Sequence, residues 1–107
     1  MSKLFIGVDL GGTKIYTALA DENGNILKEI IKPTEASKGY EQIVEKIKDS
    51  IRYVSKDLKD EKVVSIGIGS PGPLDIKSGL IVDPPNLPFK NFNIVKALED
   101  EFELPVF

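Results

Sequence analysis

The stretch "GVDLGGTKIYTALAD", residues 7–21, decides the fold of this chain. An apolar run ends there in one carboxylate, Asp9, and the chain then turns through Gly-Gly-Thr-Lys at residues 11–14. A short apolar run bounded by glycines is typical of a buried strand. We therefore predict one strand over residues 3–10 and a second over 14–20, joined by a tight turn.

The residues that follow extend this pattern into a meander and then a helix. Asn23-Gly24 is a strong hairpin signal, and residues 26–33 are the expected returning strand, closed by a proline. Over residues 40–58 the apolar side chains recur at spacings of three and four. This spacing predicts an amphipathic helix with one apolar stripe.

The second half of the chain predicts further strands and a second helix. Residues 62–70, "KVVSIGIGS", are apolar on both faces, which suits a parallel strand. A proline-rich loop with a short strand near residues 80–82 follows, then a helix over 93–102 and a final strand beginning at 104–107. The order β-β-β-α-β-α-β indicates an α/β fold with a mixed sheet.

Composition excludes several classes of protein. The chain has 107 residues, a net charge of −3 and a pI of about 5.0, which argues against a nucleic-acid-binding face. It contains no cysteine, so it can hold no disulfide and no thiolate metal site. It shows neither signal-peptide features nor an apolar run of ~20 residues. A cytoplasmic protein is the expectation.

The residues after the first strand have the chemistry of a phosphate site. Gly11 and Gly12 can expose consecutive backbone N–H groups to an anion. Thr13 adds a hydroxyl donor, and Lys14 adds a positive charge. Asp9 could approach a phosphate through Mg²⁺, across a water that the ion retains. A plain hairpin turn, which also favours Gly-Gly, remains the alternative.

Three motifs carry a resemblance to a known family. "GVDLGGTKIYTALAD" resembles the first phosphate motif of the superfamily of sugar kinases, heat-shock-70 proteins and actin, in the form typical of the ROK family (repressors, open reading frames, kinases). "IGIGSPGPLD", residues 66–75, resembles that family's Gly-x-Pro-Gly-Pro-x-Asp loop. Residues 79–107 resemble its stretch from Pro-Asn-Leu through a helix to Leu-Pro-Val. Within the family the motifs resemble those of bacterial glucokinases, and the implied fold is the ribonuclease-H-like, actin-like ATPase domain.

The resemblance implies a two-lobe enzyme that transfers the γ-phosphate of ATP to a hexose, with glucose favoured. Asp9 would serve the Mg²⁺ ion, while Gly72 and Asn86 would line the sugar pocket. Four residues of the turn would bind the ATP phosphates: Gly11, Gly12, Thr13 and Lys14.

By the same resemblance, residues 1–107 correspond to an incomplete N-terminal lobe. The family's general base lies in an Asn-Asp-x-Asn segment beyond Phe107, so no catalytic residue is expected in this chain. The second phosphate motif and the zinc-binding His and Cys cluster of many members would also lie beyond it. We therefore expect the isolated chain to be inactive, and its open sheet edge to favour a homo-oligomer.

Two other functions remain open. A sugar-sensing repressor of the family would carry a helix-turn-helix segment ahead of the first strand, which here begins by Lys3. A non-catalytic actin-like module would use the nucleotide as a switch. The Pro-Gly-Pro loop around Gly72 and the Pro-Asn-Leu loop around Asn86 favour a sugar ligand over both.

Overall fold

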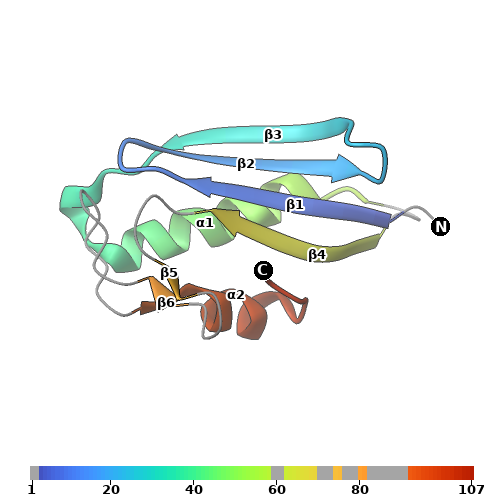
Figure 1. Ribbon diagram of the computed structural model, residues 1–107. Helices are drawn as coiled ribbons and strands as arrows, with labels where there is room; N and C mark the ends of the chain where they lie inside the picture. The colour runs from blue at the N-terminus through green and yellow to red at the C-terminus, as the bar shows by residue number, and fades with distance from the viewer. Residues whose placement is uncertain (1–2, 59–61, 70–73, 76–79, 82–91) are drawn as a thin grey trace.

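The computed structural model describes residues 3–58, 62–69, 74–75, 80–81 and 92–107. A four-stranded sheet dominates it, and one long helix runs along a single face of that sheet (Figure 1). The predicted α/β class is confirmed.

The sheet is mixed, as the sequence predicts. Its strands are β1 (Lys3–Leu10), β2 (Lys14–Asp21), β3 (Ile26–Pro33) and β4 (Lys62–Gly69), in the order β3-β2-β1-β4. The first three form an antiparallel meander, and β4 pairs with β1 in parallel. The carboxyl ends of β1 and β4 therefore meet at the same end of the sheet (Figure 1).

The turn between β2 and β3 confirms the hairpin signal. Gly24 has a φ of 83°, a conformation that glycine adopts without strain. The Asp21 carboxylate accepts hydrogen bonds from the backbone N–H groups of Asn23 and Asn25, each at 2.9 Å. These bonds, and one from the Asn25 side chain, lower the pKa of Asp21.

Helix α1 (Tyr40–Ser55) buries its predicted apolar stripe, but it is shorter than the sequence pattern indicates. The helix ends because Lys56 is extended, with a ψ of 161°, and Asp57 is left-handed, with a φ of 69°. Leu58 still packs against the core after the helix has stopped. The apolar period therefore predicted the burial correctly and the helix end wrongly.

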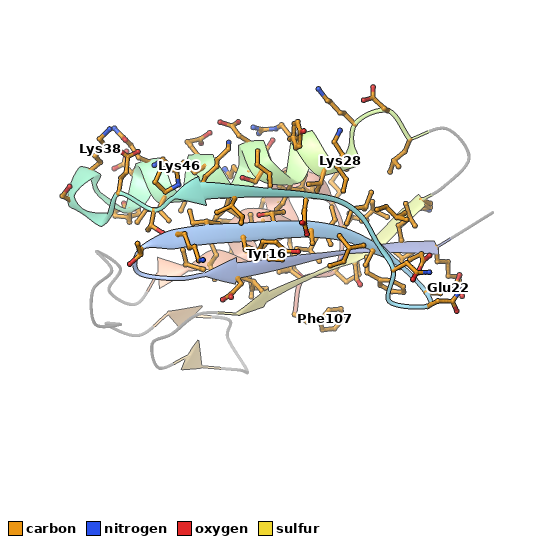
Figure 2. The ribbon with its side chains drawn as sticks, turned by 90° about the horizontal axis from the view of Figure 1, so that it is seen from above. Tyr16, Glu22, Lys28, Lys38, Lys46 and Phe107 are labelled. Carbon is orange, nitrogen blue, oxygen red and sulfur yellow. The ribbon has the colours of Figure 1, made fainter. Side chains whose placement is uncertain are left out.

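The core lies between the sheet and the helices. Strand β1 alternates strictly, so that every second residue is buried. These residues pack with α1 and with α2 (Ile94–Phe102) in one cluster. Figure 2 shows α1 lying along one face of the sheet. The β1 residues in the cluster are Leu4, Ile6, Val8 and Leu10.

Short strands complete the described residues. β5 (Leu74–Asp75), β6 (Leu80–Ile81) and β7 (Phe92–Asn93) form a small antiparallel sheet, of which the sequence predicted only the middle strand. The predicted strand over 104–107 is present as a single parallel bridge from Val106 to Ile66. Backbone hydrogen bonds of 2.8–2.9 Å to β4 flank that bridge.

Candidate functional site at the carboxyl ends of β1 and β4

Asp9 lies one residue before the end of β1, between two neighbouring strands. It pairs in register with Tyr16 of β2 on one side and with Gly69, the last residue of β4, on the other. Because β1 alternates, the Asp9 side chain is exposed and lies on the face opposite α1. No hydrogen bond or ion pair of its carboxylate is found within the described residues, so it is available to a ligand.

The turn that follows is closed by one backbone hydrogen bond, from the N–H of Gly11 to the carbonyl of Lys14 at 3.0 Å. A Cβ atom at Gly11 would lie 2.9 Å from that same carbonyl oxygen. Close approach, rather than a positive φ, explains why glycine stands there. The described glycines with positive φ are Gly24 and Gly39.

The turn leaves backbone donors without acceptors. Among the described residues, nothing accepts a hydrogen bond from the N–H of Gly12 or Thr13. Successive unpaired N–H groups form a concave site that favours an anion. Thr13 and Lys14 are exposed on the same turn. The arrangement can therefore present backbone, hydroxyl and ammonium donors to one anionic ligand.

Thr34, which the sequence did not single out, holds this turn from outside. Its hydroxyl donates to the carbonyl of Gly11 at 2.8 Å, and its backbone N–H donates to the carbonyl of Thr13 at 2.9 Å. Thr34 is fully buried. The sequence gives only a weak signal for this role, a threonine directly after the proline that ends a strand. The hydrogen bonds that explain its burial join residues more than twenty positions apart.

Lys46 of α1 anchors the segment after β3. Its ammonium group donates to the carbonyl of Pro33 at 2.6 Å and pairs with the Glu35 carboxylate. Glu35 also pairs with Lys38 at 2.9 Å. Lys46 and then Lys38 lower the pKa of Glu35 to about 2. Figure 2 shows Lys38 and Lys46 near each other, at the end of the sheet where β3 stops.

A shallow hollow opens beside Asp9 on the sheet face opposite α1. Its volume is about 470 Å³, and the small glycine and alanine residues of the strands leave it open. Tyr16, at its rim, donates a hydrogen bond to Glu29, which raises the pKa of the phenol. The lining residues are Gly7, Val8, Asp9, Tyr16, Ala18, Gly67, Ile68 and Gly69.

The residues fit a magnesium ion better than a metal held by protein alone. Among the described residues, no cluster of three or more His, Cys, Asp or Glu side chains could hold a metal. Mg²⁺ keeps several waters and is bound by one or two carboxylates together with substrate phosphates. The single carboxylate of Asp9, beside a turn whose donors suit an anion, fits that donor set.

None of the described helices is long and apolar enough to cross a membrane.

The structure thus brings together five of the seven residues that the sequence nominates for a site. These five lie at one end of the sheet: Asp9, Gly11, Gly12, Thr13 and Lys14. Gly72 and Asn86, nominated for a sugar pocket, lie outside the described residues.

Solved structures share this arrangement over nearly the whole chain. A ROK family glucokinase from Streptomyces griseus, in complex with glucose and AMPPNP, is 33% identical with a TM-score of 0.85, covering 96% of this chain and 31% of that one. A ROK family transcriptional regulator, at 21% identity and a TM-score of 0.82, covers 98% of this chain and 27% of that one, and shows the fold alone. The fold is the actin-like ATPase fold of ROK proteins.

Curated relatives agree with the solved structures. The glucokinase of Thermotoga maritima is 40% identical over 89 residues, which are 82% of this chain and 27% of that protein. A fructokinase of Lactococcus lactis subsp. cremoris is 32% identical over 112 residues, which cover all of this chain and 35% of that protein. The chain thus spans about a third of the length of these relatives. The model of the ROK family matches residues 5–107, and the chain belongs to that family.

Proposed function

We propose that residues 1–107 form the N-terminal part of an ATP-dependent kinase that phosphorylates a hexose, with glucose as the favoured substrate. The carrying observation is the turn after β1, where backbone N–H groups lie beside the carboxylate of Asp9 and neither has a partner among the described residues. The glucokinase and fructokinase relatives support a sugar as the phosphate acceptor. The AMPPNP complex of the Streptomyces griseus enzyme supports ATP as the donor.

In this proposal the turn binds the phosphates of ATP. Gly11 and Gly12 let the phosphate oxygens approach the main chain, because neither carries a side chain. The N–H of Gly12, the Thr13 hydroxyl and the Lys14 ammonium group offset the negative charge of the phosphate chain. Phosphoryl transfer depends on such positioning and charge stabilisation more than on covalent chemistry by the protein. Asp9 would hold the Mg²⁺ through a water, and the bound ion would neutralise further phosphate charge.

Sugar binding and proton transfer involve other residues. Gly72 and Asn86 are proposed to contact the hexose, since an uncrowded backbone amide and a side-chain amide both suit hydroxyl groups. The P–O bond to ADP breaks as the sugar hydroxyl bonds to phosphorus. The general base that takes the hydroxyl proton is proposed to lie in the part of the kinase beyond Phe107.

The proposal is tested by ATP consumption in the intact kinase. ADP release is measured with Mg²⁺ and glucose, fructose or N-acetylmannosamine, and without any sugar. Sugar-dependent release supports the proposal, and the sugar with the highest kcat/KM names the substrate. Release that no sugar stimulates refutes it, and would favour a nucleotide switch. Binding of a DNA operator, relieved by sugar, would favour a regulator.

The 107-residue chain assayed alone should show no turnover. It supplies the phosphate turn but covers only about a third of its relatives. The intact kinase, assayed beside it under the same conditions, is the control. Sugar-dependent ADP release by the isolated chain would contradict this expectation and would place the general base within residues 1–107.

We also propose that the protein is cytoplasmic, where ATP is abundant, and that it is a homo-oligomer. Strand β3 lies at the edge of the four-stranded sheet, and its Ile26, Leu27 and Ile31 side chains are more than half exposed. An open apolar edge favours pairing with another copy. Light scattering tests this: a monomer at high concentration contradicts it. Dissociation by Ile31→Lys would place the contact at β3.

A further inference from the structure

Thr34 fixes two carbonyl groups of the turn between β1 and β2 at once. Its hydroxyl donates to Gly11 and its backbone N–H to Thr13, at 2.8 and 2.9 Å. The residue is fully buried. A buried donor that loses its acceptor is costly, so both bonds resist opening. The turn is therefore held at two points, two residues apart.

Fixing these carbonyls also fixes the direction of the amides. The carbonyl of Gly11 and the N–H of Gly12 belong to one planar peptide group, as do the carbonyl of Thr13 and the N–H of Lys14. Both peptide groups are trans, as are all others in the described part of the chain. In a trans peptide the carbonyl and the N–H point in opposite directions. Because both carbonyls point toward Thr34, both N–H groups point away from it.

Lys46 holds Thr34 in turn. Its ammonium group reaches the carbonyl of Pro33 at 2.6 Å and that of Thr34 at 3.5 Å, and it pairs with Glu35. Lys46 belongs to α1, the helix that packs along the sheet. The turn is thereby connected to α1 through residues 33–35, a segment to which the sequence analysis gave no role.

We infer that Thr34, anchored by Lys46, is a positioning residue that aims the N–H groups of Gly12 and Lys14 at the phosphates. The inference rests on the proposed kinase function and adds two residues outside the phosphate motif. Thr34 acts through Gly11 and Thr13 and touches no substrate in this proposal. Its loss should weaken ATP binding while leaving sugar binding unchanged.

The kinetic test uses Thr34→Val in the intact kinase, with Thr17→Val as matched control. Both threonines are fully buried, but the Thr17 hydroxyl has no hydrogen-bond partner among the described residues. Thr34→Val should raise the KM for ATP about five- to tenfold, the size of one lost hydrogen bond, and leave the KM for sugar within about twofold. Thr34→Ser should restore the KM for ATP, and Thr17→Val should not change it.

A second measurement separates this inference from the kinase proposal. In the ligand-free 107-residue chain, Thr34→Val should accelerate amide hydrogen exchange at positions 11 and 34. Thr17→Val should not accelerate exchange at either position. If the intact wild type phosphorylates no sugar, the kinase proposal fails while the exchange result still decides the positioning. If the kinase is active and Thr34→Val leaves the KM for ATP unchanged, the positioning role is overturned.

Lys46→Met provides a second test of the anchor in case Thr34→Val does not fold. Lys46 is not among the residues of the hydrophobic core cluster, so its replacement leaves that cluster intact. Like Thr34→Val, it should raise the KM for ATP. The two effects should not add in the double variant, because both substitutions loosen the same anchor. Additive effects, or an unchanged KM for ATP in Lys46→Met, would overturn the anchoring by Lys46.

Discussion

The backbone N–H of Gly11 donates a 3.0 Å hydrogen bond to the carbonyl of Lys14, and a Cβ atom at Gly11 would lie 2.9 Å from that same oxygen. The turn thus closes at a separation that only glycine permits. The close approach joins the end of β1 to the start of β2. It also keeps Lys14 next to the amides of Gly12 and Thr13, which have no acceptor in the described part of the chain.

Gly11→Ala should therefore destabilise the chain by about 1–3 kcal/mol, the usual cost of forcing an extra carbon into a packed contact. The free energy of unfolding in urea measures it on the 107-residue chain. Gly7→Ala and Gly67→Ala are the controls, because a Cβ atom at either position meets nothing within 4 Å. Equal urea midpoints for Gly11→Ala and these controls would contradict the close contact.

If Asp9 holds the magnesium as proposed, Asp9→Asn should reduce kcat of the intact kinase about a hundredfold, because a neutral amide lacks the charge that attracts the ion. Stability should not fall, since the exposed Asp9 carboxylate has no partner in the described part of the chain. Asp57→Asn removes an equal charge from an exposed turn, 4.0 Å from Lys28, and should leave kcat unchanged. Wild-type kcat in Asp9→Asn would remove the magnesium role.

The sequence predicts β1 and the apolar stripe of α1 well because burial in both follows a local period. β1 alternates with period two, and α1 repeats its apolar residues every three or four positions. The turn at residues 11–14, for which we propose phosphate binding, could be located for a similar reason, since all its residues lie within one short motif. Local patterns cannot show how distant segments meet.

The features that sequence reasoning missed are accordingly long-range. Thr34 bonds to a turn more than twenty residues earlier, and Tyr16 bonds to Glu29 across the β2–β3 pair. The end of α1 is a local exception, because it depends on the left-handed Asp57, which the apolar period cannot reveal. The final strand is reduced to one bridge between Val106 and Ile66.

Acid should weaken the anchor of the turn through Glu35. Its pKa falls from 4.5 to about 2 because Lys46 and Lys38 favour the charged carboxylate. A lowered pKa in the folded state means that the stabilisation is complete above about pH 4.5 and is lost as the pH falls toward 2. Wild type should therefore lose more stability than Glu35→Gln between about pH 6 and pH 3, as measured by urea unfolding.

Lys46→Met provides the control for that pH dependence. Lys46 is the largest cause of the low pKa of Glu35, so the effect of Glu35→Gln on acid sensitivity should shrink when Lys46 is replaced. An effect that stays the same size in the Lys46→Met background would mean that the ion pair does not cause the acid sensitivity.

Thr17→Val should raise the free energy of unfolding by about 1 kcal/mol. Thr17 lies on the helix-facing side of β2, opposite Val8 of β1 and Ile30 of β3, and it is fully buried. Its hydroxyl has no hydrogen-bond partner among the described residues, so folding removes it from water without compensation. Valine has nearly the same shape and contains no polar group to desolvate.

Thr17→Ser separates the hydroxyl from the methyl group. It keeps the unpaired hydroxyl and deletes a buried methyl, so it should destabilise the chain by about 1 kcal/mol. Urea unfolding of the three proteins should rank valine above threonine above serine. A loss of stability in Thr17→Val would mean that the hydroxyl is satisfied in solution, because only a lost hydrogen bond makes an isosteric apolar replacement costly at a buried position.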